Sequence, residues 1–181
     1  MRVLTDDPAL AAAFVPAQGR DGWRRDGDLA PHDWHLVNAL GGAPVWSQDI
    51  LPGDTFWSTI VLLSQTGFSQ FDAFERLLGT GCTLGGPIAS LALAGNRFHG
   101  QRGRRWEAVR GNLHVSLAVP TRLDAAHIGA GLSMLPAVGA VDAIVSASQA
   151  AVRPGIKWVN DVVIGERKIG GVLTAAHTTE R

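Results

Sequence analysis

The side chains best suited to charge-based chemistry lie in one stretch, residues 157–173. The chain has two lysines, Lys157 and Lys168, and both lie there, while arginine supplies the other strongly basic side chains. An ammonium group is a compact point charge that suits a phosphate or a carboxylate, and a planar guanidinium does not replace it. Asn160 and Asp161 lie between the lysines. These residue types indicate anion binding, with two solvated lysines beside a turn as the simpler alternative.

This stretch is expected to form a β-hairpin. Residues 162–164 (Val-Val-Ile) are a β-branched run, residues 165–166 (Gly-Glu) supply a turn, and residues 169–173 resume an apolar strand. One hairpin would therefore carry both the basic and the acidic candidates.

A second candidate is the glycine- and arginine-rich loop at residues 95–106. Three interpretations stay open: a solvated connection, a nucleic-acid patch with Phe98 and Trp106 among the arginines, and an anion-binding flap. In a flap, Gly100 and Gly103 would let the backbone approach a ligand while guanidinium groups pair with phosphate. The arginines around this loop are Arg97, Arg102, Arg104, Arg105 and Arg110.

Length and composition limit the classes of fold and function. A chain of 181 residues that is 46% hydrophobic and 18% charged can form one ordered domain with a sizeable core. The formal net charge of zero gives no overall attraction to nucleic acid or to an anionic membrane, and we expect neither as a partner. A single cysteine, Cys82, and no signal-peptide pattern favour a cytoplasmic location. His32 and His35 have no partners spaced to complete a metal site.

The order of expected elements is typical of a mixed α+β fold: a largely antiparallel sheet with helices packed on one face. The helical region at 124–151 is expected to break near Pro136. Residues 1–50 are weakly patterned, and we treat them as an unassigned, partly irregular N-terminal segment before a domain at 51–181. The other expected elements are strands at 55–63, 87–94 and 112–119, and helices at 9–15 and at 70–78 after a Ser69 cap.

Together, the loop and the hairpin resemble the catalytic domain of biotin protein ligases, within the biotin/lipoate ligase superfamily. The family pattern Gly-Arg-Gly-Arg-Arg-Gly-Arg-x-Trp, then Asn-Leu-x-x-Ser-Leu, is similar to residues 98–106 (Phe-His-Gly-Gln-Arg-Gly-Arg-Arg-Trp) and 112–117 (Asn-Leu-His-Val-Ser-Leu). The pattern Lys-Trp-Pro-Asn-Asp, then Gly-Arg-Lys-Ile-Ala-Gly-Ile-Leu, is similar to residues 157–161 (Lys-Trp-Val-Asn-Asp) and 166–173 (Glu-Arg-Lys-Ile-Gly-Gly-Val-Leu). The order and separation of the motifs also agree.

The resemblance implies an ATP-dependent ligase that activates a carboxylic acid, with biotin favoured, as an acyl-adenylate. The acyl group would then pass to a lysine of a biotin carboxyl carrier protein domain. ATP and Mg²⁺ are the implied cofactors, and a homodimer is left open. A lipoate or octanoate ligase or transferase of the same fold is the alternative within the superfamily. A non-catalytic acyl- or nucleotide-binding relative and a nucleic-acid-binding module are alternatives of other classes.

The resemblance also implies roles for single residues. Lys168 would be catalytic, bridging the acyl carboxylate and the α-phosphate, and Asp161 would be a direct or an indirect Mg²⁺ partner. The implied nucleotide-binding residues are Lys157, Asn160, Asp161, Arg102, Arg104 and Trp106. The implied acyl-binding residues are Ser69, Gln70, His99, Gly100, Gln101, Gly103, Gly170 and Gly171.

The chain departs from the family pattern at several positions. His99 and Gln101 stand where the loop's first two arginines would be, and the Ser-Thr-Asn of the first helix is matched at best by residues 68–70 (Phe-Ser-Gln). These positions face the acyl group, so the resemblance specifies the nucleotide better than the acid. The later Gly-x-Gly-x-Asn strand and C-terminal β-barrel of many members have no counterpart, and we expect a chain truncated at its C-terminus.

Overall fold

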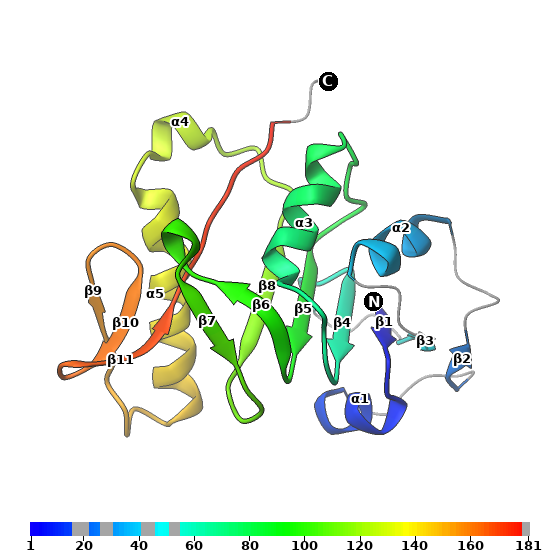
Figure 1. Ribbon diagram of the computed structural model, residues 1–181, viewed down its shortest axis with the longest axis horizontal. Coiled ribbons are helices and arrows are strands. Elements are labelled where there is room, and N and C mark those ends of the chain that lie inside the picture. Colours follow the sequence, from blue (N-terminus) through cyan, green and yellow to red (C-terminus); the bar gives the residue numbers. More distant parts are fainter. Residues whose placement is uncertain (16–21, 26–30, 41–45, 51–54, 179–181) are drawn as a thin grey trace. The chain divides into compact units, whose positions relative to one another are not determined.

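The computed structural model describes residues 1–15, 22–25, 31–40, 46–50 and 55–178 (Figure 1). Its internal contacts divide these residues into two compact units. Unit 1 comprises Met1–His99 with Arg105–Pro120, and unit 2 comprises Gly100–Arg104 with Thr121–Thr178. Each unit has a β-sheet of its own.

Unit 1 is built on a six-stranded sheet with the strand order β2-β3-β1-β4-β5-β8. β4 pairs in parallel with β1 and β5, whereas the β1–β3, β2–β3 and β5–β8 pairs are antiparallel. The mixed α+β class predicted from the sequence is therefore confirmed. The strand bounds are β1 Arg2–Thr5, β2 Arg24–Arg25, β3 Trp46–Asp49, β4 Thr59–Leu63, β5 Ile88–Ala92 and β8 His114–Ala118.

Two helices, α2 (Pro31–Ala39) and α3 (Gln70–Gly79), cover the face of this sheet that carries Leu4. The spacing of apolar residues along 70–78 predicts α3, and the structure confirms it. Their shared apolar cluster is the main core of unit 1, with each side chain at most 7% exposed. Its members are Leu4, Leu36, Val37, Leu40, Val61, Leu63, Ala73, Phe74, Ile88, Ala92 and Ala118.

The opposite face of the six-stranded sheet is covered by α1 (Pro8–Phe14). Ala11 of this helix packs with Val3 and Leu62, which point away from the main core because successive strand residues face opposite sides. The Asp7 carboxylate caps α1 by accepting the first free backbone N–H groups of the helix. Helices thus lie on both faces of the sheet, whereas the sequence predicted helices on one.

The described residues among the first fifty are an integral part of unit 1. β1 lies between β3 and β4, and Val3, Leu4 and Thr5 are fully buried. A boundary at residue 50 therefore does not separate two units of the fold. The sequence signal is weak because β1 has four residues and is covered on both faces, which removes the polar–apolar alternation of a half-buried strand. Part of the segment predicted to be partly irregular, residues 16–21, 26–30 and 41–45, lies outside the described residues.

Asp49, at the end of β3, ties this edge of the sheet together. Its carboxylate accepts a hydrogen bond from Nε of Arg2 at 2.9 Å and another from Arg24. Hydrogen bonding by Arg2 is the largest influence on the pKa of Asp49; with the help of Arg24 it outweighs burial and lowers that pKa below its ordinary value of 3.8. The folded state thus favours the ionised carboxylate.

The lowered pKa predicts how Asp49 contributes to stability as pH changes. A depressed folded-state pKa gives stabilisation that is present above the ordinary value and is lost as pH falls through the folded value. Because half of this side chain is exposed, we expect Asp49→Asn to lower the free energy of unfolding at pH 7 by no more than about 1 kcal/mol. Urea unfolding of the native protein and of Asp49→Asn at pH 7 and at about pH 3 measures this difference in the free energy of unfolding. A difference that stays equally large in acid would contradict the assignment.

The glycine- and arginine-rich segment forms a two-stranded antiparallel ribbon, β6 (Gly95–His99) and β7 (Arg105–Ala108). The sequence predicted a loop here, because its glycines and exposed arginines hide the strand pattern. The connection between the strands contains a short 3₁₀ helix, η2 (Gln101–Gly103), and the backbone N–H of Gly100 donates to the carbonyl of Arg104 at 2.7 Å.

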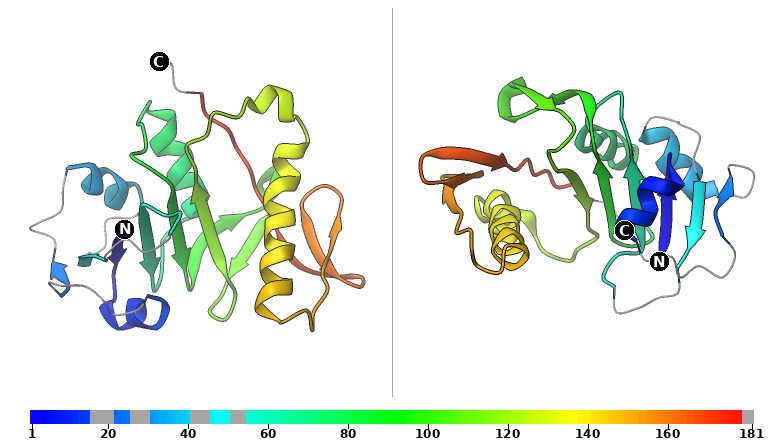
Figure 2. Two further views of the ribbon diagram at one scale, coloured as in Figure 1. Left: turned by 180° about the vertical axis from the view of Figure 1, so that it is seen from behind. Right: turned by 90° about the horizontal axis from the view of Figure 1, so that it is seen from below.

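Unit 2 combines two helices, α4 (Ala125–Ile128) and α5 (Gly131–Ala147), with a three-stranded antiparallel sheet in the order β11-β10-β9. α5 packs along β9 and β10 (Figure 2). The sheet confirms the predicted hairpin and its turn at 165–166, and it adds β9 as a third strand. The bounds are β9 Gly155–Lys157, β10 Asp161–Ile164 and β11 Arg167–Gly171.

The predicted break near Pro136 is wrong. Gly129, with a φ of 55°, ends α4, and α5 continues through Pro136. A glycine at positive φ ends a helix readily, whereas a proline removes one backbone hydrogen bond that the rest of the helix can outweigh. α5 has 17 residues, and none of the helices in the described ranges is long and apolar enough to cross a bilayer.

Candidate functional site

The three-stranded sheet of unit 2 places the predicted cations and the predicted carboxylate on one face. Asp161 on β10 lies directly opposite Lys157 on β9 and Gly171 on β11. Directly paired residues of antiparallel strands project to the same side of a sheet. Lys157 and Asp161 therefore share a face, as a common anion-binding role requires.

A β-bulge in β11 brings Lys168 onto that face. The pairing of β10 with β11 shifts between Val162 and Val163, so Val163 lies opposite Lys168 and Ile169 is the extra residue. In a regular ladder Val163 would pair with Ile169, and Lys168 would point to the other side. With the bulge, Nζ of Lys168 lies 2.6 Å from Oδ1 of Asp161.

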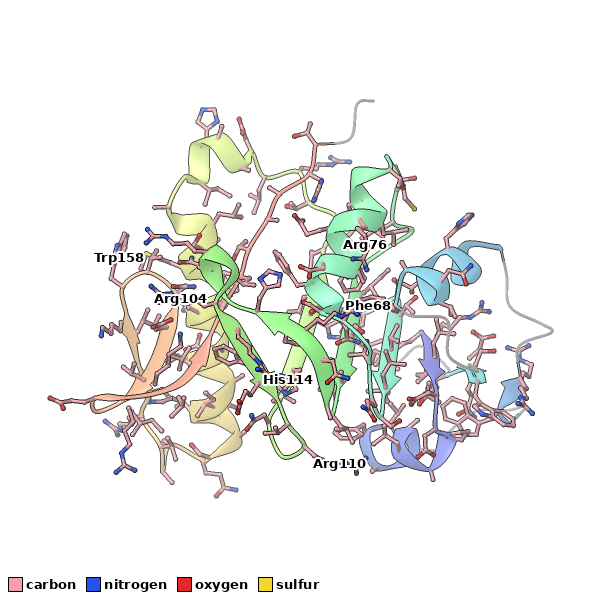
Figure 3. The ribbon with its side chains drawn as sticks, in the orientation of Figure 1. Phe68, Arg76, Arg104, Arg110, His114 and Trp158 are labelled. Atoms are coloured by element: carbon pink, nitrogen blue, oxygen red, sulfur yellow. The ribbon has the colours of Figure 1, made fainter. Side chains whose placement is uncertain are left out.

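The two members of this ion pair are accessible. Lys168 is 46% and Asp161 29% exposed in their side chains, and Trp158 projects from the turn between β9 and β10 (Figure 3). An ion pair this exposed contributes at most about 1 kcal/mol to stability. The arrangement therefore serves the placement of charge more than it serves the fold.

Asn160 has a structural task beside its predicted one. Its Nδ2 donates to the carbonyl of Val172 at 2.6 Å, and the backbone N–H of Val172 donates to the Asn160 carbonyl at 3.0 Å. These bonds fasten the end of β11 to the turn before β10. The predicted contact to nucleotide phosphate would fall to other atoms of Asn160, and it stays a prediction.

In unit 1, the two predicted acyl-binding residues of α3 are buried. Ser69 is at the N-cap position, as predicted, but its hydroxyl makes no capping hydrogen bond. Gln70 is 1% exposed, and its Nε2 donates to Oγ of Ser90 at 2.6 Å. Within the described ranges, Oε1 of Gln70 is buried without a hydrogen-bond partner. Phe68 precedes these two residues, and the Arg76 guanidinium lies 4.7 Å from its ring centre (Figure 3).

His114 of β8 is a second buried polar group in this neighbourhood. It is 7% exposed, its ring centre lies 5.2 Å from that of Phe98, and no partner for its Nε2 is found in the described parts of the chain (Figure 3). His114 pairs with Ala92, which shares a face of β5 with Ser90. Gln70, Ser90 and His114 therefore gather on one side of the sheet. A buried polar atom left unsatisfied costs about 1–3 kcal/mol, and such atoms are typical of places that a ligand or a water completes.

Sequence reasoning missed His114 and Ser90. The alternation in β8 was the available signal, but hydrophobicity alone assigns it the wrong way round. His114 and Ala118 are buried, whereas Leu113, Val115 and Leu117 are 74%, 48% and 53% exposed. The better signal in the sequence was a histidine that alternates with the small residues Ser116 and Ala118 on one face of the strand.

His99 anchors the β6–β7 ribbon to α3. Its Nε2 lies 2.8 Å from Oδ1 of Asp72 in the first turn of α3. The adjacent Phe98 pairs with Trp106 across the ribbon. The predicted acyl contact of His99 thus coexists with a structural contact. The remaining predicted loop residues, all exposed, are Gln101, Arg102, Gly103 and Arg104.

Two groups of side chains that could bind a ligand therefore emerge, each assembled within its own unit. Lys157, Asp161 and Lys168 form the charged group of unit 2, and Gln70 with His114 belongs to the buried polar group of unit 1. No cluster of three or more histidine, cysteine, aspartate or glutamate side chains occurs in the ranges that the structure covers.

Comparison with known proteins defines the class of the fold first. The biotin protein ligase of Leishmania major in complex with biotin has a TM-score of 0.54 at 24% identity, over 66% of this chain and 52% of that one. The biotin protein ligase of Aquifex aeolicus in complex with biotin and ATP has a TM-score of 0.52 at 22% identity, over 68% and 49%. At such identities the likeness concerns the fold.

The sequence comparison then gives the family. The pattern of the biotin/lipoate A/B protein ligase family matches residues 89–180, and the chain belongs to this family. A curated relative, the biotin--[acetyl-CoA-carboxylase] ligase of Paracoccus denitrificans, is 36% identical over 112 residues, which are 62% of this chain and 45% of that protein. The chain spans about half the length of the relatives it matches.

Proposed function

We propose that this protein is an ATP-dependent ligase that activates a carboxylic acid, with biotin favoured, as an acyl-adenylate and transfers it to a lysine of a carrier protein. Membership of the biotin/lipoate A/B protein ligase family supports this proposal. The Paracoccus denitrificans relative is named as a biotin ligase of acetyl-CoA carboxylase, which favours a biotin carboxyl carrier domain as the acceptor. A homodimer and a cytoplasmic location stay predictions.

The face of the unit 2 sheet with Lys157, Asp161 and Lys168 is the observation that carries the proposal. In the first step a carboxylate oxygen attacks the α-phosphorus of ATP, forming an acyl–phosphate bond as the bond to pyrophosphate breaks. Two anions must approach each other, so a cation between them lowers the barrier. The Lys168 ammonium can donate hydrogen bonds to an oxygen of the acid carboxylate and to an oxygen of the α-phosphate, and Lys157 can hold the outer phosphates. In the second step the amine of the carrier lysine displaces AMP.

Asp161 is the residue that would hold Mg²⁺. Mg²⁺ commonly binds one or two carboxylates together with substrate phosphates and several waters. A single accessible carboxylate beside the Asn160 amide fits an ion that arrives with the nucleotide better than one held in a closed protein cage. Once bound, the ion would neutralise phosphate charge.

The buried polar group in unit 1 favours an acid with a polar head over a plain alkyl acid. Biotin carries a cyclic urea with N–H donors and a carbonyl acceptor, which can complete both Gln70 and His114. Octanoate offers neither kind of group at its far end. Lipoate or octanoate ligation nevertheless stays the alternative within the family.

Gln70→Leu tests this preference. The substitution keeps the side-chain volume and removes the amide, so we expect the KM for biotin to rise about tenfold or more while the KM for ATP changes little. Steady-state pyrophosphate exchange at varied biotin and varied ATP measures both constants, and thermal unfolding checks the fold. Equal changes in the two KM values would show that Gln70 does not contribute to recognition of the acid.

Exchange of labelled pyrophosphate into ATP tests the activity itself, with biotin, lipoate and octanoate supplied in turn. Exchange with biotin supports the proposal, and exchange with lipoate or octanoate alone selects the alternative acid. If a folded preparation exchanges with none of them, it is a binding relative without turnover, and calorimetry with biotin and with ATP then measures what it binds.

A further inference from the structure

The side chain of Lys168 passes over Gly171 on its way to Asp161. A β-carbon at residue 171 would lie 3.2 Å from Nζ and 3.3 Å from Cε of Lys168, and 3.6 Å from Oδ1 of Asp161. The first two distances are tighter than most real contacts of a β-carbon, so a methyl group there would displace the end of the Lys168 side chain by a few tenths of an ångström. Such a shift acts directly on the atom that donates the 2.6 Å hydrogen bond to Asp161.

The backbone conformation does not require glycine at residue 171. Its φ lies outside the positive range that favours glycine, so any residue could adopt this backbone. Glycine also weakens a strand, because it costs more conformational freedom and packs no side chain. The adjacent Gly170 differs: its β-carbon would meet Val162 at 3.5 Å, an ordinary contact.

We propose that Gly171 is a positioning residue, whose missing side chain keeps open the path by which Lys168 lies across β11 onto Asp161. Two further features hold the same arrangement. The bulge at Ile169 turns Lys168 to the face of Asp161, and the Asn160 bonds to Val172 fix the strand end beside Gly171. Together these features hold the Lys168 ammonium beside the Asp161 carboxylate before an anionic substrate binds. The substrate then competes with Asp161 for this ammonium.

The two lysines of the chain make the placement directly measurable. In the full chain labelled with ¹⁵N-lysine, only two side-chain ammonium signals are expected, and Lys157→Arg assigns them. Asp161→Asn then gives the Lys168 signal of a broken pair. We expect Gly171→Ala to move the Lys168 signal part of the way toward that position, and Gly171→Val to move it the whole way. Gly170→Ala, the matched control, leaves it where it is in the native protein.

Two results would overturn the proposal: a Lys168 signal that Gly171→Ala leaves unmoved in a folded protein, or an equal movement in Gly170→Ala. Circular dichroism on heating checks folding, and the unfolding midpoint of Gly171→Ala should equal or exceed the native one. Should Gly171→Val fail to fold, Gly171→Ala decides alone.

The catalytic consequence rests on the proposed function and is tested separately. Gly171→Val should lower the kcat of pyrophosphate exchange at least about tenfold while the KM for ATP changes much less, because the ammonium is displaced and the nucleotide contacts of Lys157 remain. If the native protein shows no exchange, the proposed function fails while the ammonium spectra still decide the placement. Native kcat in a Gly171→Val protein whose Lys168 signal has moved would overturn the catalytic part.

Discussion

Lys168→Ala is expected to lower acid-dependent pyrophosphate exchange by about a hundredfold to a thousandfold. Its ammonium is the group that the bulge at Ile169 carries to the Asp161 face, and the proposed adenylation step needs a cation between two anions. Exchange rates at saturating acid and ATP measure the loss. Because Lys168 is 46% exposed, the free energy of unfolding should change by less than about 1 kcal/mol, so the loss is not one of folding.

Two matched variants sharpen this result. Lys168→Arg keeps the charge but replaces a point charge by a planar fork, so it should restore little activity. Lys157→Ala removes the other lysine of the same face and should act mainly through the KM for ATP. Exchange in Lys168→Ala above about a tenth of the native rate would exclude Lys168 as the bridging cation.

Leu4→Ala is expected to lower the free energy of unfolding by about 2–5 kcal/mol. Leu4 is fully buried at the centre of the six-stranded sheet, where it packs against α2 and α3. Replacing its isobutyl side chain with a methyl group loses apolar burial and leaves a cavity that the surrounding structure closes only in part. Urea unfolding followed by circular dichroism measures the change.

Leu117→Ala is the control for this prediction. Leu117 lies in the same sheet but is 53% exposed, so the same chemical change should cost less than about 1 kcal/mol. Equal losses in the two variants would show that β1 is not anchored as described. The comparison therefore tests directly whether the first residues of the chain belong to the fold of unit 1.

The charged face of unit 2 was largely readable from the sequence. The β-branched run 162–164, the Gly-Glu turn and the spacing of two lysines around Asp161 predicted a hairpin that carries cations and a carboxylate. These signals are local, because a two-residue turn fixes which strands pair. The predicted α1, α3, β5 and β8 are confirmed as well, because capping residues and apolar spacing are also local signals.

What the sequence could not supply depends on register and on long-range burial. Period-two alternation cannot reveal the bulge at Ile169, yet the bulge decides which face Lys168 occupies. The buried environment of His114 depends on α3 and β6, which approach it from distant parts of the chain. β1 gives almost no pattern because both of its sides are covered.

The position of β1 between β3 and β4 has a consequence for how the chain folds. β1 pairs with β4, with Arg2 beside Thr59, so unit 1 must close a long loop before this inner strand is held on both sides. The β10–β11 hairpin needs only two residues between its strands. β1 is thus fixed only by strands that are distant in the sequence, whereas the hairpin that bears Lys168 can form from neighbouring residues alone.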